Sequence, residues 1–183
     1  MPDDTELLAV LESLRERGAL GEASLPDAVA HADLFMAAIP LTCRSLIDLG
    51  SGGGLPGLVL ASRLIDVRVV LTDRRERRMD LLRLACARLG FGDRVSVLTT
   101  DVVALGREPH CCAAFDVVTA RAFGEPIWTL SCARPFLAGG GVVVISEPPN
   151  AAAFSRWPDA EVDKLGLRPS REVFPQVKRF ELR

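Results

Sequence analysis

The residues best suited to chemistry in this chain lie between Asp48 and Gly57. An acid stands two residues before a Gly-x-Gly-x-Gly turn formed by Gly50, Gly52 and Gly54. Glycine has no Cβ and tolerates positive φ, so such a turn lets a ligand approach the backbone closely. Apolar residues on both sides predict a strand that leads through the turn into a helix, whose first N–H groups can bind an acceptor.

A second acid, Asp73, closes the next predicted strand, residues 67–72. A carboxylate at this place can accept both hydroxyls of a ribose. A dinucleotide site favours Gly-x-Gly-x-x-Gly and sets a pyrophosphate on the turn. Here Asp48 would repel a pyrophosphate and would suit the ammonium and sulfonium charges of S-adenosylmethionine. We therefore expect S-adenosylmethionine as the cofactor, with a nicotinamide dinucleotide or a purely structural turn as alternatives.

Two further polar residues follow predicted strands. Asp101 ends the strand at 94–100, where a carboxylate or the next N–H, that of Val102, can meet the adenine edge; alternatively Asp101 caps a helix. Arg121 follows the strand at 115–120 and could bind a cofactor carboxylate or a substrate phosphate, or form a surface ion pair. The predicted cofactor-binding residues are Asp48, Gly50, Ser51, Gly52, Gly54, Asp73, Arg74, Asp101, Val102 and Arg121.

Four arginines follow Asp73 within the segment 74–78. They could neutralise the phosphates of an RNA backbone, or form a solvated helix face with Glu76 between them. We expect Arg77, Arg78 and Arg121 to contact the substrate. Ser51 and Ser146 have no histidine and aspartate in a suitable context, so the sequence does not support a hydrolase triad.

The elements that must position these residues alternate along the chain. Helices are expected at about 4–18 and 26–39, after Pro56, and at 76–89, 126–136 and 151–164. Strands are expected at 45–49, 67–72, 94–100, 115–120 and 142–146, followed by a hairpin at about 171–174 and 177–182.

This alternation predicts an α/β, Rossmann-like fold, since repeated strand–helix units form parallel sheets with right-handed crossovers. The last two strands have no helix between them, so one of the seven must run antiparallel. We expect an N-terminal helical segment, residues 1–40, packed on a cofactor-binding region, residues 41–183, within a single domain.

Composition excludes several classes. The net charge of −2 gives the chain as a whole no electrostatic footprint for nucleic acid, although local patches matter more. Five cysteines include no Cys-x-x-Cys pair, and His110-Cys111-Cys112 is a poor chelate, so we expect no metal. The first residues are acidic and no stretch is long and apolar enough to span a bilayer, so we expect no secretory signal, no membrane association and a cytoplasmic location.

The turn at 50–57, with Arg121-Ala122-Phe123 after the fourth strand and the basic pair Arg77-Arg78, resembles a known family. Over residues 44–147 the chain is similar to the 16S rRNA guanine-N7 methyltransferases (RsmG, or glucose-inhibited division protein B). The resemblance implies a class I methyltransferase fold, S-adenosylmethionine, and 16S rRNA or the 30S subunit as partner. Guanine N7 carries no proton, so the resemblance implies no catalytic base, and Arg121 is the one candidate for a catalytic role. The rate of methyl transfer would come from alignment of N7 with the methyl group and the sulfur.

The chain departs from the family pattern in three places. It lacks the family's Tyr-Asn-Leu-Thr segment, only His31-Ala32-Asp33 is similar to the family's histidine segment, and Glu147 stands where the family commonly has a lysine. An anion at position 147 disfavours nearby phosphate. A small-molecule methyltransferase and a non-catalytic binding module with the same fold are therefore kept as alternatives.

Overall fold

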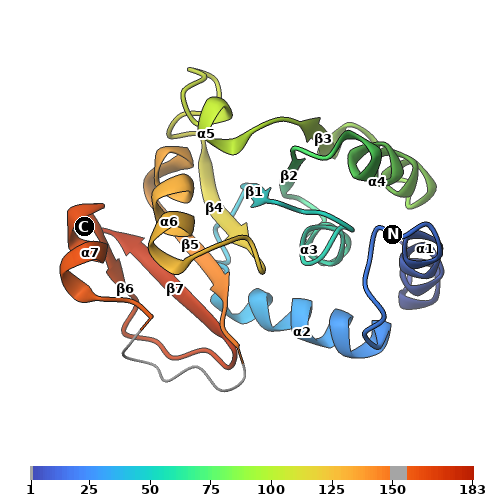
Figure 1. Cartoon of the computed structure of the whole chain (residues 1–183), viewed down its shortest axis with the longest axis horizontal. Helices are drawn as coiled ribbons and strands as arrows, with labels where there is room; N and C mark the ends of the chain where they lie inside the picture. The colour runs from blue at the N-terminus through green and yellow to red at the C-terminus, as the bar shows by residue number, and fades with distance from the viewer. Residues whose placement is uncertain (1, 149–155) are drawn as a thin grey trace.

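Strands and helices alternate along most of the chain in the computed structural model, which describes residues 2–148 and 156–183 (Figure 1). The helices are α1 (Asp4–Glu16), α2 (Leu25–Ala38), α3 (Gly57–Arg63), α4 (Glu76–Arg88), α5 (Val102–Leu105), α6 (Pro126–Ala133) and α7 (Asp159–Lys164), with short 3-10 turns at Gly92–Arg94 and Arg134–Phe136. The strands are β1 (Ser45–Leu49), β2 (Arg68–Asp73), β3 (Val95–Thr99), β4 (Phe115–Ala120), β5 (Leu137–Ser146), β6 (Leu167–Pro169) and β7 (Val177–Leu182).

The strands form one seven-stranded sheet in the order β3-β2-β1-β4-β5-β7-β6. The five strands from β3 to β5 are parallel, and β7 runs antiparallel to both of its neighbours. The chain builds outward from β1 in one direction to β3 and then returns to β4 on the other side. The predicted fold class is therefore confirmed, and ligands in such sheets bind where the order reverses, beside the carboxyl ends of β1 and β4.

Successive side chains of the central strands enter two different cores, one on each face of the sheet. Leu46, Val117 and Val144 pack with apolar residues of α1, α2, α3 and α4. Ile47 and Val118 pack on the opposite face with residues of α5, α6 and α7. Burial on both faces explains why these strands are apolar throughout.

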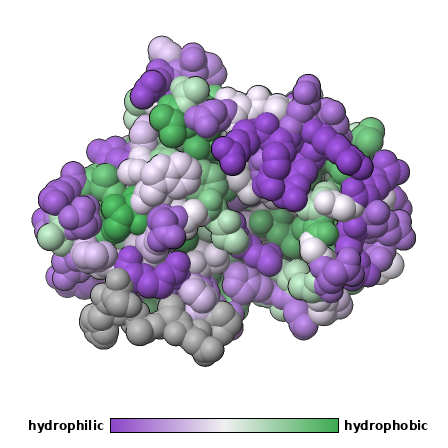
Figure 2. All heavy atoms as spheres, viewed as in Figure 1, coloured by the Kyte–Doolittle hydropathy of each residue, from purple (hydrophilic) through white to green (hydrophobic). Residues whose placement is uncertain are grey.

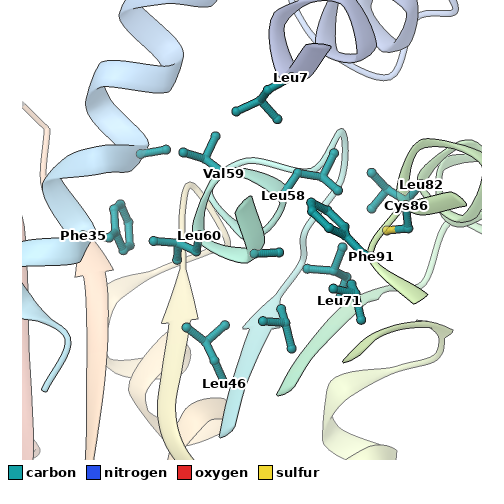
Figure 3. Close-up of a cluster of buried hydrophobic side chains, with 14 of the residues drawn as sticks. Leu7, Phe35, Leu46, Leu58, Val59, Leu60, Leu71, Leu82, Cys86 and Phe91 are labelled. Carbon is teal, nitrogen blue, oxygen red and sulfur yellow. The ribbon is translucent and has the colours of Figure 1, made fainter. Parts of the chain in front are cut away.

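The N-terminal helices belong to the first of these cores. Leu7 of α1 and Phe35 of α2 lie around Leu58, Val59 and Leu60 of α3 (Figure 3). The charged side chain of Arg63, at the end of α3, forms ion pairs with Asp4 of α1 and Asp33 of α2. These contacts attach both helices to the sheet beside the turn that follows β1.

Four of the expected elements differ from the structure by three residues or more. β5 begins at Leu137, five residues early, because Phe115 pairs with Leu137 across a register shift before Val117 pairs with Val142. The three glycines at 139–141 supply that irregularity, which a side chain at Gly140, with φ +79°, would strain. The helix expected at 126–136 ends at Ala133 and continues as a 3-10 turn.

At the other two places the predicted elements shift. The first strand of the terminal hairpin is 167–169, not 171–174, because Leu167 is fully buried whereas Val173 is exposed. Of the helix expected at 151–164, residues 159–164 form α7 and residues 156–158 are not helical, whereas residues 151–155 lie outside the described residues. Within the described chain, no helix combines the length and the apolar character that a membrane span requires.

Candidate functional site

The glycine turn connects β1 to α3 and is fixed to the neighbouring strand β2. Gly50, Gly52 and Gly54 all have positive φ, which explains why glycine occupies these positions. The Ser51 N–H donates to the Thr72 carbonyl at 2.8 Å, and the Thr72 N–H donates to Ser51 Oγ at 3.1 Å. Ser51 therefore holds the shape of the turn from beneath, and its side chain is buried.

Two other glycines of the turn are needed for close packing. A Cβ on Gly53 would lie 2.6 Å from the carbonyl oxygen of Ala19 and 2.4 Å from Leu20. A Cβ on Gly57 would lie 2.7 Å from the carboxylate of Asp48. The loop after α1 thus packs directly against the turn, and the start of α3 packs directly against Asp48 of β1.

Asp48 lies inside the protein below the turn and has no exposed surface. The Thr119 hydroxyl donates to its Oδ1 at 2.7 Å, whereas Oδ2 has no hydrogen-bond partner of normal geometry. Burial raises the pKa of this carboxyl to about 6, against the opposing effects of its hydrogen bonds and of the Arg121 charge. Asp48 can therefore act on a ligand only through its charge and through the backbone it supports.

A cavity of about 380 Å³ opens above the turn at the carboxyl ends of β1, β2 and β3. We call it the cofactor cavity. Its volume falls within the range of ordinary small-molecule sites. Five of the residues predicted to bind the cofactor line its wall, and aromatic side chains close it; the lining is Gly50, Asp73, Arg74, Arg75, Thr100, Asp101, Val102, Ala122, Phe123 and Trp128.

Asp73 is engaged by Arg75 in this structure. Its Oδ1 accepts from the N–H and Nε of Arg75, both at 2.9 Å, and its Oδ2 accepts from the second guanidinium nitrogen at 2.7 Å. Burial acts to raise the pKa of the Asp73 carboxyl, but the Arg75 hydrogen bonds outweigh it and the pKa is lowered. The carboxylate is thus charged and buried, while the arginine side chain is half exposed.

Asp101 does two things at once. Its Oδ1 accepts from the N–H groups of Val103 and Ala104, so it caps α5 as the alternative interpretation expected. It also lines the cofactor cavity beside Val102, and its other carboxylate oxygen makes no bond within the described chain. The capping interpretation is therefore confirmed, whereas contact between Asp101 and an adenine edge stays a prediction.

A second cavity, of about 280 Å³, lies beyond Ala122 and Phe123, which line both cavities. We call it the acceptor cavity. The Phe123 ring covers Gly50, where a Cβ would lie 2.5 Å away, and stacks on Trp128 at 5.1 Å between ring centroids. Other residues of its lining come from α2, the segment after β4, α6, the end of β5 with the residues after it, and the segment before α7: His31, Arg121, Gly124, Pro126, Thr129, Ile145, Ser146, Glu147, Pro148, Arg156 and Trp157.

Two buried polar atoms in the acceptor cavity have no partner within the described chain. They are Nδ1 of His31 and one terminal guanidinium nitrogen of Arg121. Burial, and next the Arg121 charge, lower the pKa of His31. Buried polar atoms left unpaired are costly in a folded protein, and their presence in a cavity is typical of a ligand site.

The predicted substrate arginines lie in two separate places. Arg121 lines the acceptor cavity, whereas Arg77 and Arg78 lie on the first turn of α4. Hydrophilic side chains gather on the surface over the region of β2, β3 and α4 (Figure 2). Arg78 also faces the glycine turn, since a Cβ on Gly52 would lie 3.4 Å from its guanidinium.

Sequence reasoning missed several lining residues. Trp128 and Trp157 carry no local motif, and each enters its cavity from a helix or segment outside the recognised strands. His31 was noted only for its similarity to a family segment. Within the described ranges, no group of three or more histidine, cysteine or acidic side chains could hold a metal ion.

Comparison with known proteins identifies a family that this chain matches. Residues 9–150 match the family model GidB, described as rRNA small subunit methyltransferase G. The protein of that name in Leifsonia xyli subsp. xyli is 34% identical over 161 residues, which are 86% of this chain and 74% of that protein. Relatives in Rhizorhabdus wittichii and Sorangium cellulosum are 44% and 39% identical over 77 and 100 residues. Those two matches cover 42% and 55% of this chain but only 33% and 41% of the relatives' own length.

Solved structures share the fold at low sequence identity. An O-methyltransferase from Bacillus cereus, solved in complex with SAH, has a TM-score of 0.68 at 16% identity and covers 100% of this chain and 93% of its own. The O-methyltransferase TomG from Streptomyces achromogenes, in complex with SAM, has a TM-score of 0.64 at 17% identity and covers 99% and 91%. At such identities the likeness concerns the fold alone.

Proposed function

The chain belongs to the rRNA small subunit methyltransferase G family, and from this premise we propose that it is an S-adenosylmethionine-dependent methyltransferase acting on guanine N7 of 16S rRNA. The observation that carries the proposal is the pair of adjoining cavities, which share Ala122 and Phe123. A cofactor in one cavity and an acceptor in the other would lie next to each other at these two residues.

The residues of the cofactor cavity fit S-adenosylmethionine. Glycines at positive φ bring the backbone close to the ligand, Asp73 offers a buried carboxylate to the ribose hydroxyls, and Asp101 with Val102 offers an edge for adenine. The buried charge of Asp48 below the turn favours a cationic ligand over a pyrophosphate. When bound, this cofactor supplies an electrophilic methyl group on a sulfonium.

The chain's own residues have little proton chemistry to perform. Guanine N7 presents a lone pair and carries no proton, so the acceptor needs alignment and exclusion of water. Phe123 and Trp157 provide apolar walls, and Arg121 provides an unpaired donor in the acceptor cavity. Arg74, Arg77 and Arg78 would meet phosphates of the RNA outside it.

A small-molecule acceptor is the second candidate, favoured by the modest volume of the acceptor cavity, about 280 Å³. This is slightly below the usual range for drug-sized ligands. A single base turned out of its strand also suits a snug pocket of this kind, with ribose and phosphates left outside. The volume fits either acceptor, and membership of the family favours the RNA base.

The cofactor is tested by calorimetry with S-adenosylmethionine, its demethylated product and NAD. We expect saturable binding of the first two and none of NAD. Asp73→Ala should weaken binding by roughly 1–3 kcal/mol because charge-assisted bonds to the ribose are removed. NAD binding without S-adenosylmethionine binding would overturn the assignment.

The acceptor is tested by transfer of a labelled methyl group to 30S subunits, to protein-free 16S rRNA and to a small-metabolite extract. We expect label in the RNA, released as 7-methylguanine on hydrolysis. Label only in the extract would favour the second candidate. Cofactor binding without transfer to any of the three would favour a non-catalytic module.

A further inference from the structure

Glu147 is the anion that departs from the family pattern, and the structure gives it defined partners. It follows the last residue of β5 and lines the acceptor cavity. Trp157 Nε1 donates to one carboxylate oxygen at 2.6 Å, and Arg156 donates to the other at 3.2 Å. Only 14% of its side chain is exposed.

The contacts with Arg156 and Trp157 alter both the effective charge of the Glu147 carboxylate and its capacity to accept hydrogen bonds. The nearby Arg156 charge offsets the carboxylate charge, so Glu147 repels phosphate less than its sequence position indicates. Two donors hold the carboxylate in one orientation, and a carboxylate has about four acceptor sites. About two sites therefore remain for donors of a ligand.

Acceptors and donors are thus supplied by different residues of one cavity. Glu147 offers only acceptors while ionised, whereas Arg121 offers an unpaired donor. Trp157 and Phe123 both contribute aromatic surface to the lining of this cavity. A planar ligand with adjacent N–H groups on one edge and a carbonyl on the other matches this distribution.

Guanine has that pattern, with N1–H and the N2 amino group on one edge and O6 and N7 on the other. Adenine does not, because its N1 is an acceptor and its N6 amino group is the single donor group of that edge. We propose that Glu147 selects guanine by accepting hydrogen bonds from N1–H and the N2 amino group. Arg121 donates to O6, and N7 is left free as the nucleophile. This proposal rests on the proposed function and names the residue that sets its base specificity.

The test measures binding of GMP, IMP and AMP to protein saturated with S-adenosylhomocysteine, by ligand-observed NMR. IMP keeps N1–H and lacks the N2 amino group, so it separates the two bonds. We expect affinity to fall in the order GMP, IMP, AMP, with GMP at least about tenfold above AMP, because hydrogen bonds to charged groups are the strong ones. Equal binding of the three, or no GMP binding at millimolar concentration, overturns the proposal.

Glu147→Gln tests the residue itself, since glutamine keeps the size and can still accept from Trp157. We expect the preference for GMP over AMP to fall about tenfold while S-adenosylhomocysteine affinity stays unchanged. Glu125→Gln is the matched control, because it removes the same charge from an exposed residue that does not line the acceptor cavity. It should leave the GMP preference intact.

The outcomes separate this proposal from the proposed function. Failure of the parent to bind S-adenosylhomocysteine removes the methyltransferase assignment. An equal loss of GMP and AMP binding in Glu147→Gln, with cofactor binding retained, means that the carboxylate only supports Trp157 and overturns the specificity role. If Glu147→Gln does not fold, the order of the three nucleotides on the parent decides.

Discussion

At the scale of single residues, the pairing of Asp73 with Arg75 bears directly on cofactor binding. The carboxylate predicted to bind the ribose already accepts three hydrogen bonds from Arg75. Two of them come from the guanidinium of a half-exposed side chain, whereas the third comes from the backbone. Ribose hydroxyls would therefore have to replace the guanidinium contacts.

Arg75→Ala should bind S-adenosylhomocysteine more tightly, by roughly fivefold, because an ion pair with an exposed partner is worth up to about 1 kcal/mol. The same change leaves a buried carboxylate without its charged partner, so the ligand-free protein should melt at a lower temperature. The rise in melting temperature on adding ligand should then be larger than in the parent. Calorimetry and melting curves with and without ligand measure both effects. Arg77→Ala, nearby on the first turn of α4 and not bonded to Asp73, is the control. Weaker binding in Arg75→Ala would show that Arg75 itself holds the ligand.

Asp48 gives a prediction about pH. Its pKa is raised to about 6, from roughly 3.9 in an unfolded chain, so the native state binds more protons between these values. The Asp48 carboxyl therefore lowers the free energy of unfolding least below about pH 4, where it is protonated in both states. This destabilising effect grows as pH rises through about 6. Asp48→Asn removes this titration and keeps an oxygen for Thr119.

The free energy of unfolding of Asp48→Asn, relative to the parent, should therefore increase between about pH 4 and pH 7 by on the order of 2 kcal/mol. Urea titrations of both proteins at several pH values give this difference directly. Parallel curves would mean that the carboxyl keeps an ordinary pKa in the fold.

What the sequence could predict at this scale depended on local pattern. The glycines and the acids at strand ends were found because their spacing relates directly to a turn and to the carboxyl edge of a parallel sheet. The Arg75 pairing, the burial of Asp48 under Gly57 and the role of Trp128 depend on side-chain packing between distant segments. No local spacing encodes such contacts.

At the scale of elements, the N-terminal segment presses on the turn through Gly53. A Cβ there would lie 2.6 Å from the Ala19 carbonyl oxygen, so backbone would have to move. Gly53→Ala should destabilise the protein by about 1–3 kcal/mol and weaken cofactor binding, since the turn carries the cofactor cavity. Gly21→Ala is the control, because a Cβ at Gly21 meets nothing within 4 Å. Urea unfolding with calorimetry measures both; a Gly53 variant as stable as the Gly21 variant would contradict the packing.

The elements themselves were predicted well wherever periodicity and end signals agreed. β1, β2, β3, β4 and α4 match within a residue or so, since apolar runs buried on two faces and helical spacing are strong signals. β6 was misplaced because a three-residue strand has too few residues to show alternation. α5 was missed for the same reason, although Asp101 was recognised as a possible cap.

At the scale of the whole molecule, a net charge of −2 conceals a local gathering of arginines. No ion pair involves Arg74, Arg77 or Arg78 among the described residues. They lie at the mouth of the cofactor cavity and on the first turn of α4. Hydrophilic side chains gather on the surface over this region in Figure 2. Local charge, and not the total, is what an RNA backbone meets.

Under the proposed function, this arrangement would divide RNA recognition between the arginines of α4 and Arg121. Arg77→Ala with Arg78→Ala should lower RNA affinity and reduce the slope of log affinity against log salt by about 1.4, because each phosphate that a side chain neutralises on a single strand contributes about 0.7 to that slope. Arg121→Ala should lower methyl transfer with a smaller change in slope, because its side chain lines the acceptor cavity. Arg88→Ala removes one arginine charge from the far end of α4 and serves as control for the change in charge alone.

Fluorescence anisotropy with a 16S rRNA fragment between about 50 and 200 mM salt measures the slopes. The parent and the Arg88 variant should share one slope, since the far end of α4 lies away from both cavities. An unchanged slope in the Arg77 and Arg78 double variant would mean that the first turn of α4 does not contact phosphate. The assignment would then move toward a small-molecule acceptor, because the arginines beside the cofactor cavity would have no RNA backbone to bind.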